Sequence, residues 1–567
     1  MKKKALTVII PMILILLIAG GIVGKKLIDK YSYSTEEADM DTYFGVNSSD
    51  ERAIILQDEM VEEQIKIHND ICYLDLDTIK KYLNETFYVD ENEQLLLYTT
   101  AMETYETSFG QSGYTNAQGD HQTSYEICYR DGETIFVALD YVKLFTNFSY
   151  EVYDRHVQIY TEWGVRNTAE LAKKSAVRLR GGIKSPILRR VEEGETVEVL
   201  EQMETWCKVK TSDSIIGYVE NKHLTNEGTL QETPVTDVQL PEYTSLSMDQ
   251  KVSLAWHAIG GVGGNDTLSA MINGSKGLNV IAPTWFSLCD EEGNFRSFAA
   301  SGYVEKAHAQ GLQVWAVWDD FNYENETGND ISVYNALSST TVRRNMVDQV
   351  INAALQYGVD GVNIDFETIG KDSGPHFAQF LRELSIRCRE QGLVLSVDNY
   401  VPLNFNDYYR LDIQGLVADY VIIMGYDEHW HGCSEPGSVA SIDYVTGGIE
   451  KTLQEVPAAK VVNALPFYTR VWTIEGANVT DSSLTIANTA DFLGRIGVEP
   501  IWDETTCQNY LEWGSGAKTY RVWLEDKESL KAKLNVMTAH DIAGVAVWEV
   551  SFGNQEVWEL ISAYANS

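Results

Sequence analysis

The sequence predicts an α/β protein that begins with a single membrane-spanning helix and ends in a (β/α)8 TIM barrel, with two small modules between them. Three observations predict this architecture: an uncharged N-terminal run, an internal repeat followed by short alternating strands, and eight apolar runs separated by helical patterns. At 567 residues the chain is long enough for roughly three or four domains.

The charge of the chain restricts the kind of partner that it can bind. Lys and Arg number 44, Asp and Glu number 83, and the formal net charge is −39. A surface this acidic argues against binding nucleic acid, or anionic lipid headgroups, through overall charge. A polymeric substrate would have to be held by stacking and hydrogen bonds instead.

Residues 1–30 are expected to form an N-terminal membrane anchor. Residues 5–24 carry no charge, and about 20 apolar residues cross the roughly 30 Å hydrocarbon core as a helix. A cleavable signal peptide has a shorter apolar region of about 7–15 residues and a small-residue cleavage site, so a retained anchor is preferred. Lysines flank the run on both sides and leave its orientation undecided. They are Lys2, Lys3 and Lys4 before it and Lys25, Lys26 and Lys30 after it.

An internal repeat occupies residues 71–165. Residues 73–84 align with 136–147, and residues 94–99 align with 156–161. Each copy predicts a short strand, a helix and a hairpin strand in an α+β module. The pattern resembles the copper amine oxidase N-terminal-like domain, although the segment shows no set of copper ligands. The resemblance implies a spacer or a wall-binding module.

Residues 175–226 predict a small all-β barrel, because short alternating runs are broken by Gly and polar turns about every 8–12 residues. The order of these runs closely resembles a bacterial SH3 domain, whose usual partner is the peptide or glycan of the cell wall. Trp206 either stacks on such a ligand or belongs to the core of the small barrel.

Two further segments are expected to connect the modules. Residues 31–70 are polar and acidic and predict a stalk with some helical character. Residues 227–245 lack periodicity and predict a linker.

Residues 246–567 predict the barrel. Continuous apolar strands with helical crossovers imply a parallel sheet covered by helices, and eight such units in about 320 residues fit a (β/α)8 barrel. A doubly wound open sheet is the alternative, but no Gly-rich phosphate loop follows the first run. The runs are 252–258, 278–286, 312–318, 359–367, 393–399, 418–426, 460–466 and 543–549.

The fourth run carries the clearest chemical signal. Side chains alternate along a strand, so Asn363, Asp365 and Glu367 share one face. In a barrel this polar face points to the centre, and the carboxyl end of the strand lies where barrel enzymes place their sites. Two carboxyl groups this close cannot both ionise cheaply, so one pKa should rise, as a general acid requires.

The part of this run from Asp360 and Gly361 to Glu367 resembles the Asp-Gly-x-Asp-x-Asp-x-Glu signature of the chitinase-like family-18 glycoside hydrolases. The resemblance covers roughly residues 245–567. It implies that Glu367 protonates the glycosidic oxygen and that Asp365 orients the 2-acetamido group of the sugar. It also implies that this acetamido group, rather than an enzyme side chain, is the nucleophile. The sugar at the cleavage site must then carry an N-acetyl group.

One position departs from the family pattern. Asn363 replaces the middle Asp; it can hydrogen-bond Asp365 but cannot accept its charge, which predicts an altered pH dependence. The same Asn-Ile-Asp-Phe-Glu wording occurs in the spore-cortex glucosaminidase branch, which favours peptidoglycan as the substrate. Asp360 falls on the other face of the strand and is expected to be structural.

The ends of other runs resemble further family motifs. Met424-Gly-Tyr426-Asp427 resembles Met-x-Tyr-Asp, whose Tyr bonds the acetamido carbonyl and whose Asp shapes the site. The segment 465–470 resembles the motif of the seventh strand, and Trp548 stands where the family's Trp floors the sugar. A further candidate is Asn399, at the end of the fifth run. Besides Glu367, Asp365 and Tyr426 as catalytic residues, the predicted substrate-binding residues are Asp427, Trp548, Asn363, Asn399, Tyr468 and Arg470.

No cofactor or metal ion is expected. His429 and His431 have the spacing of a metal pair, but no third ligand is evident nearby, and the implied mechanism needs no metal. Three tryptophans just past strand ends either line further subsites or are buried; they are Trp285, Trp318 and Trp430.

Together these observations predict an extracellular, single-pass membrane protein that cleaves β-1,4 bonds after N-acetylglucosamine in peptidoglycan. The SH3-like module would contact the cell wall, the N-terminal helix the membrane, and nucleic acid is not an expected partner. The alternatives are a chitinase or chito-oligosaccharide hydrolase, and a catalytically silent glycan-binding scaffold.

Overall fold

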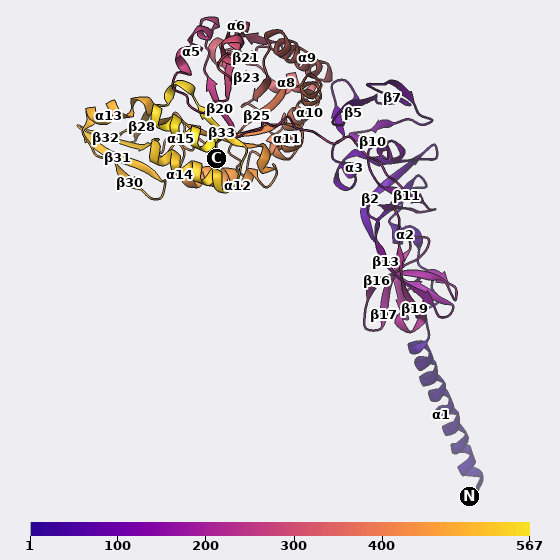
Figure 1. The fold of residues 1–567 in the computed structure, drawn as a ribbon. Helices are drawn as coiled ribbons and strands as arrows, with labels where there is room; N and C mark the ends of the chain where they lie inside the picture. Colours follow the sequence, from indigo (N-terminus) through magenta and orange to yellow (C-terminus); the bar gives the residue numbers. More distant parts are fainter. Residues whose placement is uncertain (1) are drawn as a thin grey trace. The chain divides into compact units, whose positions relative to one another are not determined.

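The computed structural model describes residues 2–567, with side chains from Pro11 onward, and divides into two compact units (Figure 1). The first runs from the N-terminus to Phe87 and also includes Thr107–Tyr114 and Asp120–Leu240. The second consists of Tyr88–Glu106, Thr115–Gly119 and Pro241–Ser567.

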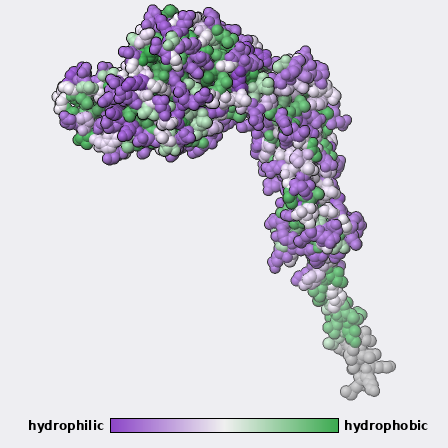
Figure 2. All heavy atoms as spheres, viewed as in Figure 1, coloured by the Kyte–Doolittle hydropathy of each residue, from purple (hydrophilic) through white to green (hydrophobic). Residues whose placement is uncertain are grey.

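The first unit begins with the helix α1 (Lys2–Tyr31). Its segment Pro11–Tyr31 has a mean hydropathy of 1.9 and is not buried by the rest of the protein, so by length and composition it could cross a membrane. In Figure 2 the described part of this helix is largely hydrophobic, whereas the module beside it is mostly hydrophilic at its surface.

Residues 31–70 do not form the stalk that their composition suggested. After the short helix α2 (Met40–Phe44) they contain the strands β1 (Glu51–Leu56) and β2 (Glu59–His68). The apolar residues at 53–55 of β1 are buried, and β1 pairs with β2 on one side and with β12 (His156–Tyr160) on the other. These two strands supply the centre of the seven-stranded sheet of the repeat module, in the order β11-β12-β1-β2-β3-β10-β9.

Both copies of the repeat have the predicted strand, helix and hairpin. The first copy contains β3 (Ile71–Asp75), α3 (Leu76–Tyr82), β4 (Tyr88–Asp90) and β5 (Leu95–Thr99). The second contains β10 (Thr134–Ala138), α4 (Leu139–Val142), β11 (Ser149–Val152) and β12. Between them lie β6 (Thr104–Ser108), β7 (Gly113–Asn116), β8 (Gly119–Gln122) and β9 (Cys128–Asp131).

The hairpins of the two copies have different partners. The β11–β12 hairpin joins the sheet of its own module through β1. The β4–β5 hairpin instead belongs to the barrel unit, because its polar groups bind the barrel helices: Asp90 accepts from the backbone N–H of Thr340, and Arg343 donates to the Tyr88 hydroxyl (3.0 Å). The range 71–165 is therefore not one compact unit.

The small β module has the strand order β15-β14-β18-β17-β16-β13-β19. Its apolar core is formed by Leu171, Val177, Val191, Val197, Cys207, Val209 and Val219. The strand β19 extends to Gln231 and pairs with β13, so residues 227–231, expected in the linker, belong to this sheet. The strands are β13 (Val165–Leu171), β14 (Ser175–Arg178), β15 (Ile187–Val191), β16 (Thr196–Gln202), β17 (Trp206–Lys210), β18 (Ile216–Glu220) and β19 (Leu224–Gln231).

The predicted barrel is confirmed, and each of the eight runs overlaps one of its strands. Neighbouring strands are parallel, and β20 pairs with both β21 and β33, which closes the barrel. The strands are β20 (Val252–His257), β21 (Val280–Leu288), β23 (Gln313–Asp319), β24 (Gly361–Asp365), β25 (Val394–Tyr400), β26 (Tyr420–Met424), β27 (Val461–Pro466) and β33 (Gly544–Trp548).

Helices cover the outside of the barrel, where the outward strand residues form one large apolar core with them. Ser339 caps the start of α9 and Gly358, with φ 75°, ends it, as the sequence pattern of a helix requires. The main helices are α5 (Leu268–Met271), α6 (Ser301–His308), α7 (Asn322–Thr327), α8 (Val333–Ser338), α9 (Thr340–Tyr357), α10 (Gly374–Gln391), α11 (Leu411–Val417), α12 (Ile442–Thr452), α14 (Lys527–Ala539) and α15 (Gln555–Ala565).

An insertion follows the seventh barrel strand and was not predicted from the sequence. It is a five-stranded antiparallel sheet in the order β29-β28-β32-β31-β30, with the helix α13 (Thr489–Ile496) beside it. Its strands are β28 (Tyr468–Glu475), β29 (Asn478–Thr485), β30 (Ile501–Asp503), β31 (Gln508–Ser515) and β32 (Lys518–Leu524). A short edge strand, β22 (Phe295–Ser297), extends the barrel sheet beside β21.

Candidate active site

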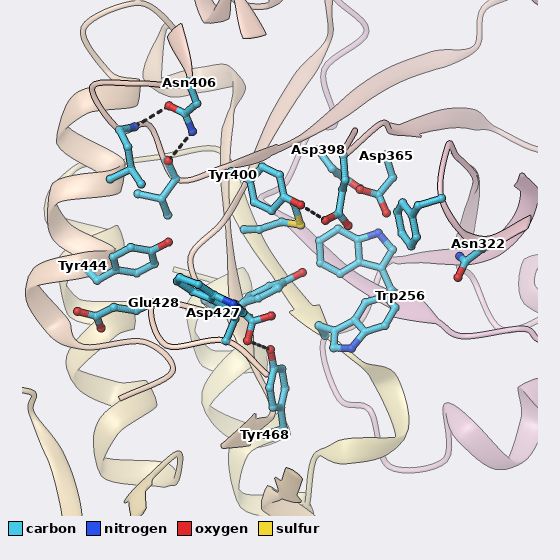
Figure 3. Close-up of a pocket in the computed structure, with 18 of the residues that line it drawn as sticks. Trp256, Asn322, Asp365, Asp398, Tyr400, Asn406, Asp427, Glu428, Tyr444 and Tyr468 are labelled. Atoms are coloured by element: carbon cyan, nitrogen blue, oxygen red, sulfur yellow. Dashed lines mark hydrogen bonds between the residues drawn. The ribbon is translucent and has the colours of Figure 1, made fainter. Parts of the chain in front are cut away.

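A pocket of about 690 Å³ opens at the carboxyl ends of the barrel strands (Figure 3). Among the predicted site residues, six line it: Asp365, Glu367, Tyr426, Asp427, Tyr468 and Trp548. Aromatic and apolar side chains form most of the remaining wall, including Trp256, Phe321, Tyr400, Phe405, Met424, Trp430 and Tyr444. The pocket has the size and the mixture of apolar walls and few polar groups that suit a sugar ring.

Glu367 lies two residues beyond the end of β24, with its carboxyl group in the pocket. Burial is the main reason that its pKa rises to about 7, and the negative charges of Asp320 and Asp427 add to this effect. The Tyr400 hydroxyl donates a hydrogen bond to the Glu367 carboxylate (the dashed line from Tyr400 in Figure 3) and lowers the pKa. A carboxyl group with this pKa can donate a proton near neutral pH.

Asp320, which follows β23, fixes the backbone at Glu367. Its carboxylate accepts hydrogen bonds from the backbone N–H of Glu367 (2.8 Å) and from the backbone and hydroxyl of Thr368 (3.1 and 2.6 Å). Burial raises the pKa of Asp320 to about 6 despite these bonds. Asp320 therefore both positions Glu367 and places a negative charge beside it.

Asp365 and Asp398 are both buried, with exposed fractions of 8% and 2%, and their carboxyl groups are close enough that Asp398 raises the pKa of Asp365. Burial and neighbouring carboxylates raise the pKa of each well above its usual range. Among the described residues, Asp365 Oδ1 and Asp398 Oδ2 accept no hydrogen bond. A buried acceptor without a donor is costly, so a ligand N–H or a shared proton would stabilise this arrangement.

Asn363 does not make the expected hydrogen bond to Asp365. Its amide donates to Asp398 Oδ1 (2.8 Å) and Ser396 (3.0 Å), while its carbonyl accepts from the Trp256 indole (3.0 Å). The side chain is fully buried and is not among the residues that line the pocket. The reason is the register of β24 with β25, in which Asn363 lies opposite Ser396.

Two residues of the insertion donate hydrogen bonds to the Asp427 carboxylate. Tyr468 donates to its carboxylate (2.7 Å), as Figure 3 shows, and the Arg470 guanidinium does so as well (3.1 Å). Arg470 also binds Asp481 of β29 (3.0 Å). Arg470 does not line the pocket, so its predicted substrate contact is replaced by a hydrogen bond to Asp427.

Asn399 points away from the pocket and is also displaced from its predicted role. Its amide is buried and exchanges hydrogen bonds with Gln414 of α11 (2.7 and 2.8 Å). Its neighbours Asp398 and Tyr400 line the pocket instead. The alternation of this run gave the signal: Ser396, Asp398 and Tyr400 share one face, and the apolar Val397 lies on the other with Asn399.

The remaining aromatic and histidine candidates separate clearly. Trp430 lines the pocket with 58% of its surface exposed, whereas Trp285 and Trp318 are buried in the core. His429 contacts the carbonyl of Ser438, and His431 contacts Asp481. In the described part of the chain, no group of three His, Cys, Asp or Glu side chains is placed to hold a metal ion. Asp360 is structural, because its carboxylate accepts from the backbone of Val314.

Two segments of the chain match known families. Residues 324–553 match the model of glycosyl hydrolases family 18, and residues 175–225 match the bacterial SH3 domain.

Curated relatives match the barrel region. The chain is 30% identical over 230 residues to YdhD of Bacillus subtilis, whose name assigns it to sporulation-specific glycosylases, a match that covers 39% of this chain and 54% of YdhD. It is 25% identical over 254 residues to a cortical fragment-lytic enzyme of Bacillus subtilis, covering 43% of this chain and 59% of that protein. The chain thus spans little more than half of the length of these two relatives.

A solved structure shares the fold. The spore cortex-lytic enzyme SleL of Bacillus cereus superposes with a TM-score of 0.51 at 17% identity, covering 67% of this chain and 90% of that chain. This likeness concerns the fold, whereas residues 324–553 of the barrel match the model of glycosyl hydrolases family 18 and residues 175–225 before it match the bacterial SH3 domain.

Proposed function

We propose that this protein is a membrane-anchored, extracellular glycoside hydrolase that cleaves the β-1,4 bond after N-acetylglucosamine in peptidoglycan. The proposal is carried by one observation: the buried Asp365 Oδ1, which has no donor among the described residues, lies in the same pocket as Glu367, whose pKa is about 7. A proton donor beside a free, buried acceptor is what a 2-acetamido sugar needs for cleavage.

The reaction follows a substrate-assisted, retaining course. Glu367 donates its proton to the glycosidic oxygen as the bond to the anomeric carbon breaks. The carbonyl oxygen of the 2-acetamido group attacks the anomeric carbon from the opposite face, and Asp365 accepts the acetamido N–H of the resulting oxazolinium. Glu367, now a carboxylate, removes a proton from a water molecule as the water oxygen attacks the anomeric carbon. This attack opens the oxazolinium ring and restores the original configuration at the anomeric carbon.

Other pocket residues support this course. Tyr426 would donate its hydroxyl to the acetamido carbonyl, and Trp548 would stack on the sugar ring. Asp427 would bind the sugar or the acetamido group while Tyr468 and Arg470 hold it. Asp398 would supply the carboxyl group that Asn363 lacks, because Asn363 binds it and it lies beside Asp365.

The other segments would place the enzyme at the cell wall. The helix α1 would be the single-pass anchor, and the bacterial SH3 domain would bind wall peptide or glycan. The repeat module, with its resemblance to the copper amine oxidase N-terminal-like domain, would act as a spacer or a second wall-binding element. Peptidoglycan is preferred as substrate because two similar proteins are named for lysis of the spore cortex or its fragments.

Two other functions would give different results in the same experiment. A chitinase or chito-oligosaccharide hydrolase would use the same acetamido chemistry. A silent glycan-binding scaffold is disfavoured, because Asp365, Glu367 and Tyr426 all line one pocket.

The test is mass spectrometry of products from the full-length protein on purified peptidoglycan and on chitin oligomers, beside Glu367→Gln. We expect new reducing-end N-acetylglucosamine from peptidoglycan, and a loss of roughly 10²–10⁴-fold in the variant, which cannot donate the proton. If products form from chitin oligomers alone, the substrate is a chitin-like glycan instead of peptidoglycan. If the wild type and the variant both bind glycan and neither releases products, the protein is a catalytically silent glycan-binding scaffold.

A further inference from the structure

One short stretch of this acidic chain is entirely basic. Residues 173–190 contain seven Lys or Arg side chains and no Asp or Glu, in a chain whose net charge is −39. They form the hairpin of β14 and β15 with the connecting loop 179–186, which we call the basic hairpin. Its cations are Lys173, Lys174, Arg178, Arg180, Lys184, Arg189 and Arg190.

The loop of the basic hairpin is bound to the residues that directly follow the apolar helix. The Lys184 ammonium donates to the carbonyl of Ser32 (2.6 Å), and the backbone N–H of Ser34 donates to the carbonyl of Ile183 (2.8 Å). The helix α1 ends at Tyr31. Ser34 lies three residues further, which even in extended chain is about 10 Å.

Further bonds continue this attachment along the hairpin. The N–H of Ala38 donates to Ile187 (2.7 Å), and the N–H of Ile187 donates to Glu36 (2.8 Å), so residues 36–38 run as an added strand along β15. The buried Arg178 guanidinium also donates to the carbonyl of Ser34 (3.0 Å). The start of the chain after α1 is thus fixed to the basic hairpin by its backbone.

The cations of the hairpin fall into two groups. Lys174, Arg189 and Arg190 pair with carboxylates of Glu192, Glu195 and Glu37, and Arg178 is buried. Lys173, Arg180 and Lys184 are exposed, and in the described part of the chain none of them pairs with a carboxylate. Lys25, Lys26 and Lys30 add three cations at the same end of α1.

We propose that the loop 179–186 rests on anionic phospholipid headgroups at the surface where α1 leaves the bilayer, with Arg180, Lys184 and Lys173 facing the phosphates. This inference rests on the proposed anchoring by α1. The headgroup layer begins where the apolar helix ends, and the loop is bound within three residues of that point. Each basic residue close to an anionic surface strengthens binding by roughly fivefold. The overall negative charge repels this surface, so the basic hairpin would fix which face of the SH3 domain meets it.

The test uses the full-length protein in vesicles of phosphatidylcholine, and in vesicles of equal parts phosphatidylcholine and phosphatidylglycerol. A membrane-impermeant acetylating reagent modifies exposed lysines, and mass spectrometry measures the rate at each site. We expect acetylation of Lys173 and Lys184 to slow by roughly fivefold in the anionic vesicles. High salt should restore the rate. Lys531, an exposed residue of α14, serves as the internal reference.

A charge reversal identifies the residues responsible. Arg180→Glu with Lys184→Glu should abolish the slowing at Lys173, whereas Lys527→Glu with Lys531→Glu, which changes the net charge equally, should leave it intact. Arg180→Lys with Lys184→Arg keeps the charge and should keep the slowing, which separates charge from a folding defect.

Vesicle flotation separates this inference from the anchoring on which it rests. Failure of the full chain to float with neutral vesicles would count against the anchor itself. Flotation with both kinds of vesicle, but equal acetylation of Lys173 and Lys184 in both, would overturn the proposed contact.

Discussion

The barrel unit contains buried carboxyl groups at two places, and they differ in the number of hydrogen-bond donors around them. Glu525, after the last strand of the insertion, receives two hydrogen bonds of 2.8 Å from the buried Lys533, and also bonds from Gln508 and Ser529. Asp365 and Asp398 at the pocket have no cation beside them, and each keeps one oxygen without a donor among the described residues.

On the proposed function, the difference separates a carboxyl group that supports the fold from carboxyl groups that serve the reaction. A buried carboxylate that only supports the fold is surrounded by donors, since an unpaired one destabilises the native state. A carboxyl group left partly unpaired stores that cost until a ligand or a proton arrives. Burial raises the pKa of Glu525 as well as those of Asp365 and Asp398, so the missing donors, rather than the raised pKa values, distinguish the pocket carboxyl groups.

The largest effect on stability is expected where the structural pair is broken. Lys533→Met leaves the Glu525 carboxylate buried without a cation, and should lower the free energy of unfolding by about 3–5 kcal/mol. Thermal unfolding of the barrel measures this loss. Lys533→Met with Glu525→Gln should recover most of it. A stable single variant would remove the distinction between the two groups.

At the pocket the expected effects are reversed. Asp365→Asn removes an uncompensated charge, so the melting temperature should stay the same or rise, while kcat falls by roughly 10²–10³-fold because the oxazolinium loses its stabilising charge. Calorimetry and product formation, measured on one preparation, check both halves. A large loss of stability would show that Asp365 is structural.

The pairing of Asp398 with Asn363 can be tested by exchange. Asp398→Asn should lower kcat, and adding Asn363→Asp should restore part of it by returning a carboxyl group to the pair. In a double-mutant cycle the two positions should couple by about 1–3 kcal/mol. Additive effects would mean that Asp398 does not replace the missing carboxyl group.

The smallest effects concern pH. Glu367 must be protonated to act, so activity falls as pH rises through its pKa near 7. Tyr400→Phe removes a hydrogen bond to the charged form and should shift this alkaline limb of kcat/KM to higher pH by about one unit. Asp320→Asn removes a neighbouring negative charge and should shift the limb to lower pH by a similar amount. Shifts in the same direction would contradict this assignment of charges.

The parts of the fold and of the site that could be predicted from the sequence are those with a regular pattern of apolar and polar residues. All eight barrel strands were predicted because each is a continuous apolar run, and Asp365 and Glu367 were found because polar and apolar residues alternate in the fourth run. The same alternation in β25 identifies Asp398 and Tyr400 rather than Asn399.

Other features depend on contacts between distant segments, which alternation within one run does not report. Asp320 acts on the backbone of Glu367, 47 residues later. Arg470 reaches Asp427 from the insertion. The strands β1 and β2 were missed because their polar residues outweigh a short apolar run, and pairing with the distant β12 stabilises them.

The β4–β5 hairpin has a practical consequence for anyone who shortens this protein. The connecting segment before β20 suggests that the enzyme could be expressed from about residue 246. Such a fragment would leave the first turn of α9 without the carboxylates of Asp90 and Glu93, and Arg343 without the Tyr88 hydroxyl. A fragment meant to keep the barrel intact should therefore begin upstream of Tyr88. Because β3 and α3 directly precede the β4–β5 hairpin, the fragment should include the repeat module.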